Sequence, residues 1–232
     1  MQDAHCCFSK QYGDRDVFVA IVSDGAGSAS HGGQGASLIC RSISSAVRRH
    51  FASTSRFPSE EEIVNWLDQT RDLIFAVAER RSLVPRDFAA TLVCAISDAD
   101  ECLVVHVGDG CVVVRDDERA EWVAPIWPDH GEYASTTSFV TDERTPALRV
   151  TTHHSPAAAI TLFSDGLERL ALDFAAKKPY AGFLDVIVRP VGASKKPGRD
   201  RNLSQQLKEY LGSPGVNART DDDKTLVIAV RK

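Results

Sequence analysis

Short apolar runs rich in branched side chains recur through most of this 232-residue chain, separated by polar turns that contain glycine. Runs of about four to eight such residues are typical of strands that are buried on both faces. Besides the apolar runs, we expect residues 2–8 to form a strand that pairs with the strand at 17–23 through a turn near 12–16. The apolar runs predict strands at 17–23, 90–97, 102–107, 111–115, 122–124, 149–152, 159–164 and 225–230.

Two stretches instead show the period of an amphipathic helix. In residues 34–47, apolar side chains recur every three or four positions and so share one face. The second stretch, 59–77, begins with Ser59 and Glu62, whose spacing is the signature of a capping box. Further helices are expected over 167–192, with a break at Pro179, and over 203–211.

The order of these elements indicates the fold class. The three strands between residues 90 and 115 are separated by the short turns 98–101 and 108–110, so we expect an antiparallel meander. The predicted order along the chain is strands, a helix pair, many strands, helices and a last strand. Strands and helices therefore do not alternate as they do in a fold with a parallel sheet. No repeat or low-complexity linker divides the chain. The sequence therefore predicts one α+β domain over residues 1–232 with antiparallel sheets.

Composition excludes several classes of protein. The chain has 27 Lys and Arg against 32 Asp and Glu, a net charge of −5, which argues against a nucleic-acid partner. No apolar run approaches the roughly 18 residues of a membrane span, and the N-terminus lacks the pattern of a secretory signal. The six cysteines include no CxxC pair, so we expect reduced thiols. A cytoplasmic globular protein without a membrane partner is expected.

Acidic residues follow several of the apolar strands. Asp24 and Asp165 each end a strand in the sequence Ser-Asp-Gly, Asp109 lies in a Val-Gly-Asp-Gly turn, and Asp222 precedes the last strand. Any one Asp-Gly at a strand end is usually a turn. Several carboxylates gathered there repel one another unless a cation compensates, and Mg²⁺ and Mn²⁺ take such oxygen ligands. Gly25 lets the backbone approach closely and could offer its carbonyl.

Taken together and in this order, the motifs resemble the metal-dependent protein phosphatases, the type 2C serine/threonine family, in its bacterial branch. The resemblance extends from residue 2 to residue 230. It implies a four-layer α/β/β/α sandwich of two antiparallel sheets flanked by helix pairs. The matching segments are Gln2-Asp3-Ala4, Asp24-Gly25-Ala26-Gly27, Gly33-Gln34-Gly35-Ala36-Ser37, Ala90-Thr91-Leu92, Val107-Gly108-Asp109, Ser164-Asp165-Gly166-Leu167 and Asp222-Asp223-Lys224-Thr225.

The resemblance also implies a centre for two Mn²⁺ or Mg²⁺ ions, with a weaker third site. In it, Asp24 would bridge both ions and would form the catalytic set with Asp165 and Asp222. Asp3 would hold metal-bound waters, and Asp109 would share the third site with Asp165. The implied metal ligands are Asp3, Asp24, Gly25, Asp109, Asp165 and Asp222.

The implied reaction is hydrolysis of phosphoserine or phosphothreonine in proteins by a metal-activated water. The implied partners are phosphorylated proteins, with a cognate serine/threonine kinase as a further candidate. Two alternatives stay open. The first is a pseudophosphatase that acts as a regulatory binding module with an impaired metal site. The second is a phosphatase of small molecules.

Some positions depart from the family pattern. Gln2 stands where many members have Glu, which would remove one ligand of the second ion or make it act through water. The strand that precedes this motif in the family, with its phosphate-binding Arg, is absent, so we expect a longer product that starts about 15–30 residues upstream. The basic loop 194–201 is expected to be solvated, with docking of an acidic phosphoprotein as the alternative.

Overall fold

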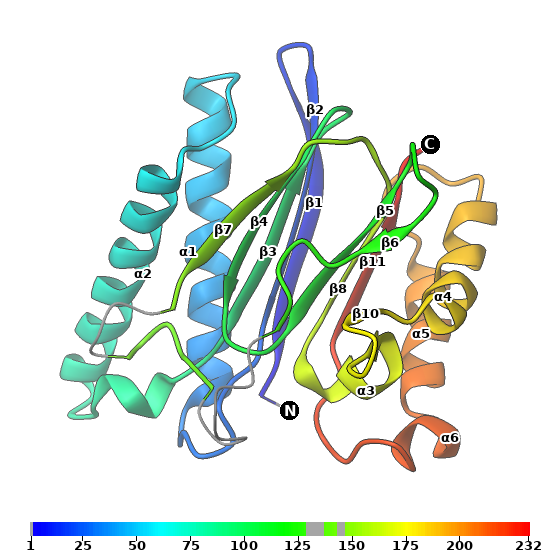
Figure 1. The fold of residues 1–232 in the computed structure, drawn as a ribbon. Coiled ribbons are helices and arrows are strands. Elements are labelled where there is room, and N and C mark those ends of the chain that lie inside the picture. Colours follow the sequence, from blue (N-terminus) through cyan, green and yellow to red (C-terminus); the bar gives the residue numbers. More distant parts are fainter. Residues whose placement is uncertain (1, 129–136, 143–146) are drawn as a thin grey trace.

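The computed structural model describes residues 2–128, 137–142 and 147–232. Two antiparallel sheets pack face to face between two layers of helices (Figure 1). Helices α1 (Gly32–Ser53) and α2 (Glu60–Arg80) cover the first sheet, and α4 (Ala181–Ala193) and α5 (Arg201–Leu211) lie beside the second. This is the four-layer α/β/β/α arrangement that the family resemblance implies.

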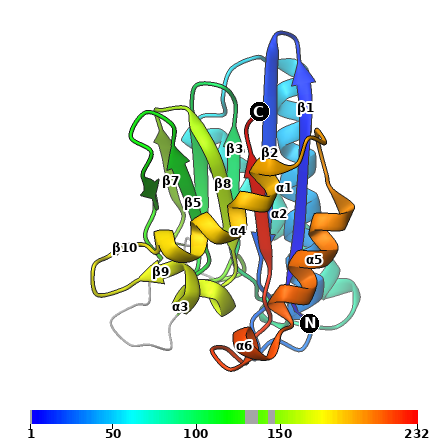
Figure 2. The same ribbon diagram turned by 90° about the vertical axis from the view of Figure 1, so that its right-hand side faces the viewer.

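The first sheet begins with a long hairpin. Its two strands pair from Ala4 opposite Ser23 to Tyr12 opposite Arg15, which confirms the predicted pairing of the N-terminal strand and extends it. Figure 2 shows the first strand of the hairpin at the edge of the sheet. In spatial order the strands are β1 (Ala4–Tyr12), β2 (Arg15–Ser23), β3 (Leu92–Ser97), β4 (Cys102–Val107) and β7 (Arg149–His153).

The second sheet contains a strand that we expected elsewhere. β5 follows β4 in the chain, yet it pairs with β8 and β6, so the meander over 90–115 is wrong at its third strand. The chain crosses between the sheets at Gly108, whose φ of +104° favours glycine. The first four residues of β5 are all apolar and carry no period that assigns the strand to a sheet. The order is β11 (Leu226–Val230), β8 (Ala157–Phe163), β5 (Cys111–Asp116) and β6 (Trp122–Val123).

The helices agree with the sequence except between residues 167 and 180. The capping box of Ser59 and Glu62 is present at the start of α2. The expected helix from 167 stops after one turn, because the chain then forms a small hairpin with a left-handed Lys177 (φ +48°) at its turn. The short elements there are η2 (Asp165–Leu167), α3 (Glu168–Ala171), β9 (Leu172–Asp173) and β10 (Lys178–Pro179). Two others are η1 (Pro85–Phe88) and α6 (Pro214–Asn217).

The apolar core lies in three layers. Side chains of α1 and α2 pack on the first sheet, the two sheets pack on each other, and α4 and α5 pack on the second sheet. All six cysteines are free thiols, as expected. Burial raises the pKa of Cys40 to about 12 and keeps that thiol protonated. Among the helices of the described residues, none combines the length and hydrophobicity of a membrane span.

Candidate active site

Strand register brings the predicted acidic residues to one end of the sandwich, the lower end in Figure 1. Ala4 pairs with Ser23, so Asp3 and Asp24 lie at the same edge of the first sheet. Leu226 pairs with Phe163 in the second sheet, so the segment that contains Asp222 lies beside Asp165. Residues far apart in sequence therefore meet, because the start of one antiparallel strand lies beside the end of its neighbour.

Thr91 holds the backbone at Asp24. The amide nitrogen of Asp24 donates to Oγ1 of Thr91 at 3.0 Å, and the amide nitrogen of Thr91 donates to the carbonyl oxygen of Asp24 at 2.8 Å. The hydroxyl of Ser23 donates to the carbonyl oxygen of Thr91 at 2.6 Å. Because Thr91 is buried, these bonds are shielded from water and fix the end of β2.

Ser164 fixes the end of β8 in the second sheet, as Thr91 fixes the end of β2 in the first. Its hydroxyl donates to Oδ2 of Asp3 at 2.8 Å and accepts from the amide nitrogen of Thr225 at 3.1 Å. Its own amide nitrogen donates to the carbonyl oxygen of Thr225 at 3.2 Å. One buried serine therefore joins the start of β1, the end of β8 and the start of β11 beside Asp165.

The carboxyl groups raise one another's pKa. Burial raises the pKa of Asp24 well above its ordinary value, and the neighbouring carboxyls of Asp3 and Asp165 raise it further. Burial also raises the pKa of Asp165, with Asp109 and Asp222 adding to the effect. A cluster of this kind is costly when every member is ionised, because the like charges are only partly screened by water.

The donor set fits a divalent cation in its chemistry. Oδ1 of Asp3 and Oδ1 of Asp165 are buried and accept no hydrogen bond within the described residues. Hard cations prefer such carboxylate oxygens, and their charge would offset the repulsion in the cluster. Among the described residues, however, no group of three or more His, Cys, Asp or Glu side chains is arranged so that it could hold a metal ion. The cluster thus has suitable ligands without a preformed cage.

Gln2 donates hydrogen bonds to the Gly25 carbonyl, one of the metal ligands that the family resemblance implies. With its amide oriented to satisfy hydrogen bonding, Nε2 donates to the carbonyl oxygens of Gly25 at 2.7 Å and Ala26 at 3.0 Å. A Glu at this position could make neither bond, because a carboxylate only accepts. The structural consequence of this departure from the family is therefore a protein donor on the expected metal ligand Gly25.

We expect Gln2→Glu to tighten Mn²⁺ binding and to lower the melting temperature of the metal-free protein. The variant frees the Gly25 carbonyl, and it adds a negative charge to a cluster that is already repulsive. Isothermal titration with Mn²⁺ and thermal melts in EDTA measure the two effects. Gln11→Glu, on the same strand but away from the cluster, is the control. Weaker Mn²⁺ binding by Gln2→Glu would count against Gly25 as a ligand.

Glu168 joins the cluster although the sequence did not single it out. It begins α3, is 7% exposed, and has a pKa raised to about 8 by burial and by the carboxyls of Asp109 and Asp165. The one available signal was its position inside the apolar segment 167–172. Thr137 was also missed, and its hydroxyl donates to Oδ2 of Asp109 at 2.6 Å.

Gly166 allows the close contact between the Asp165 turn and the segment before β11. A Cβ at Gly166 would overlap the carbonyl oxygen of Asp223 and come within 3.5 Å of the Asp222 side chain. Asp222 itself is exposed, and its Oδ1 accepts from the amide nitrogen of Asp223 at 2.8 Å. The exposed Asp222 therefore reaches Asp165 only while this contact is kept.

Gly166→Ala is expected to lower, at least about 10-fold, the rate of the phosphoester hydrolysis that the resemblance implies, and to lower the melting temperature. The added methyl group must push the Asp223 backbone away, and Asp222 moves with it. Gly192→Ala is the matched control, since a Cβ there meets nothing within 4 Å. Rates from phosphopeptide hydrolysis decide the matter, and equal rates for both variants would contradict the role of the contact.

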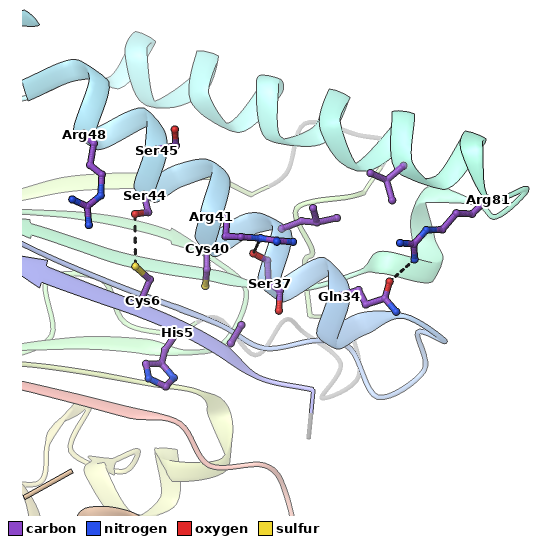
Figure 3. Close-up of a pocket in the computed structure, with 13 residues that line it drawn as sticks. His5, Cys6, Gln34, Ser37, Cys40, Arg41, Ser44, Ser45, Arg48 and Arg81 are labelled. Atoms are coloured by element: carbon purple, nitrogen blue, oxygen red, sulfur yellow. Dashed lines mark hydrogen bonds between the residues drawn. The ribbon is translucent and has the colours of Figure 1, made fainter. Parts of the chain in front are cut away.

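A groove in the structure lies away from these acidic residues. It has a volume of about 770 Å³ and runs between β1 and α1 (Figure 3). Its charged side chains are Arg41, Arg48 and Arg81, and no carboxylate lines it. The exposed Arg199 of the basic loop lies near His5 and contributes, after burial, to a lowered pKa of that histidine. The acidic cluster of the candidate active site is thus separate from this groove.

Comparison with known proteins agrees with this arrangement. Residues 1–212 match the protein phosphatase 2C family. Serine/threonine-protein phosphatase 3 of Escherichia coli strain K12 is 37% identical over 211 residues, which cover 90% of this chain and 82% of that protein. Among solved structures, the serine/threonine phosphatase Stp1 of Staphylococcus aureus superposes with a TM-score of 0.64 at 17% identity, covering 100% of this chain and 89% of that one.

A second solved structure is PppA, described as a key regulatory component of T6SS in Pseudomonas aeruginosa. Its TM-score is 0.59 at 17% identity, with 100% of this chain and 99% of that chain covered. At this identity the two superpositions show the fold alone, whereas the sequence match extends over most of the chain. The chain belongs to the protein phosphatase 2C family.

Proposed function

We propose that this phosphatase hydrolyses phosphoserine and phosphothreonine in phosphorylated proteins with the help of Mn²⁺ or Mg²⁺. The observation that carries the proposal is the cluster of carboxyl groups at one end of the sandwich, whose pKa values are raised by burial and by one another. The proposed ligands are Asp3, Asp24, the Gly25 carbonyl, Asp109, Asp165 and Asp222, and a cytoplasmic location suits such substrates.

Bound divalent ions would supply a water of lowered pKa and positive charge for the phosphoryl oxygens. The residues of the chain hold the carboxyl groups in position and limit the negative charge of the cluster. Thr91 keeps Asp24 in place through backbone and side-chain bonds, and Ser164 keeps Asp3 beside Asp165. Glu168, with a pKa raised to about 8 by burial and by the carboxyls of Asp109 and Asp165, is mostly protonated at neutral pH in the metal-free protein and then adds little negative charge to the cluster.

The clustered carboxyls also favour a hydrolase over a pseudophosphatase. Asp24, Asp109 and Asp165 interact closely enough to shift a pKa, and a binding module would have no need of so costly an assembly. Gln2 is the feature that favours the pseudophosphatase, since it occupies the Gly25 carbonyl. It touches one expected ligand and leaves the others in place.

The test is phosphate release from phosphoserine, phosphothreonine and phosphotyrosine peptides with Mn²⁺, beside small phosphate esters. We expect hydrolysis of the first two at rates well above those of the others. No release from any peptide with Mn²⁺ or Mg²⁺ would support the binding module. Faster hydrolysis of small esters than of peptides would support the small-molecule phosphatase.

A further inference from the structure

A fully buried histidine lies beneath the turn that carries Asp109. His106 on β4 is 0% exposed, and its Nε2 lies 2.7 Å from the carbonyl oxygen of Gly110. Its Nδ1 lies 2.8 Å from Nη2 of Arg149. A carbonyl only accepts and a guanidinium only donates, so Nε2 carries the hydrogen and Nδ1 accepts. The imidazole is therefore held as one neutral tautomer that donates to the turn.

Arg149 connects this histidine to a third segment. It lies on β7 directly opposite His106 in the strand register. Its Nη1 donates to the carbonyl oxygen of Trp127 at 2.8 Å, while Nη2 donates to His106. The planar guanidinium thus spans two acceptors at once, which a flexible ammonium group does poorly. β4, β7 and the segment after β6 are joined at one point under the turn.

The turn is also held against the rest of the site. A Cβ at Gly108 would come within 2.6 Å of the Thr91 side chain, the same residue that fixes Asp24. Oδ2 of Asp109 accepts from Thr137. The side chain of His106 donates to the residue after Asp109, so it opposes movement of the turn away from Thr91.

We infer that His106 and Arg149 are positioning residues, which hold the Gly108–Gly110 turn and thereby direct the Asp109 carboxyl at Asp165 and Glu168. This inference rests on the proposed function for its catalytic consequence. Its structural part, the anchoring of the turn, holds whether or not a metal binds. Neither residue touches the substrate in this role; each acts through the backbone beside Asp109.

The test compares His106→Phe with His50→Phe. His50 lies in the last turn of α1 and is also buried, at 8% exposure. Its Nε2 lies 2.9 Å from the backbone carbonyl oxygen of Arg56, which follows the helix. Both variants lose a buried hydrogen bond, so both should have a lower melting temperature than the wild type. Hydrogen exchange of the metal-free proteins should differ. We expect at least about 10-fold faster exchange in the peptide 107–112 for His106→Phe and no change there for His50→Phe.

Mn²⁺ titration gives the second measurement. We expect His106→Phe to weaken the weakest-bound ion by about 10-fold or more and to leave the tighter ions unchanged, as for other outer partners of metal ligands. His50→Phe should match the wild type. His106→Gln places an amide donor near the position of Nε2 and should restore much of both effects, and it serves as the readout if His106→Phe does not fold. Arg149→Lys should fall between wild type and His106→Phe.

The outcomes separate the two claims. Unchanged exchange at 107–112 in His106→Phe, or equal effects of the two phenylalanine variants, would overturn the positioning role. Faster exchange in His106→Phe together with a wild-type protein that binds no Mn²⁺ would keep the anchoring of the turn and refute the proposed metal-dependent function. Faster exchange with unchanged Mn²⁺ affinities would overturn the link from the turn to Asp109.

Discussion

Asp24→Asn is expected to lower the phosphatase rate at least about 100-fold and, at the same time, to raise the melting temperature of the metal-free protein. The loss of rate follows because asparagine keeps the shape but removes the charge of the proposed bridging ligand. The gain in stability follows from the raised pKa of Asp24, which is caused by burial and by the carboxyls of Asp3 and Asp165.

The sign of the stability effect can be worked out from that direction. A carboxyl whose folded pKa lies above its unfolded value contributes stability that is lost as the pH rises toward the folded pKa. Near pH 7 the chain must therefore either take up a proton at Asp24 on folding or keep a charge in a repulsive cluster. Asparagine does neither. The measurement is a pair of thermal melts in EDTA, beside phosphopeptide rates with Mn²⁺.

Asp116→Asn supplies the matched control with the opposite sign. The carboxyl of Asp116 accepts from the amide nitrogens of Arg119 and Glu118, both at 2.9 Å, and these bonds lower its pKa. Asparagine there should destabilise the fold and leave the rate unchanged. If Asp24→Asn also destabilised the metal-free protein, the cluster would not be repulsive, and near wild-type rates would refute its role as a ligand.

The parts of the fold that local physics determines were predictable. The β1–β2 hairpin and the capping box of α2 depend on neighbours in sequence, so their patterns are visible there. β5 was assigned to the wrong sheet because the apolar run of its first four residues fits either sheet. The helix from residue 167 was predicted too long because apolar residues at helical spacing also fit the small β9–β10 hairpin.

The candidate site also has features that the sequence predicted and features that depend on the tertiary structure. Acidic residues at strand ends were visible, and antiparallel register then explains why Asp3, Asp24 and Asp165 meet. Glu168 was missed because its burial depends on the tertiary structure. The bond from Gln2 to the Gly25 carbonyl was missed for a related reason, since it joins residues that only the pairing of β1 with β2 brings together. Their roles as metal ligands stay predictions.

Removing divalent ions should abolish the activity, and adding back Mn²⁺ should restore it. Saturating EDTA removes the divalent ions that the carboxyl cluster is proposed to bind, and with them the activated water that such ions would supply. Rates before chelation, in EDTA and after addition of excess Mn²⁺ give the comparison. Undiminished hydrolysis in EDTA would refute the metal-dependent mechanism while leaving the fold and family untouched.

The stabilisation by Mn²⁺ should grow as the pH rises from about 5 to about 8. Asp24, Asp165 and Glu168 have raised pKa values in the folded chain, that of Glu168 about 8, so the metal-free fold loses stability over this interval because the unfolded chain gives up these protons more readily. Mn²⁺ binds the ionised form, and its binding releases protons, which makes the affinity higher at high pH.

At 100 times its dissociation constant an ion adds about 2.7 kcal/mol, which is roughly 5–10 °C for a chain of this length. We expect a shift of that size at pH 8 and a smaller one at pH 5 with the same Mn²⁺ concentration. The double variant Asp24→Asn/Asp165→Asn should show almost no shift at either pH, because both of the buried, mutually repelling ligands are then neutral. A shift that shrank with rising pH would mean that Mn²⁺ binds away from these carboxyls.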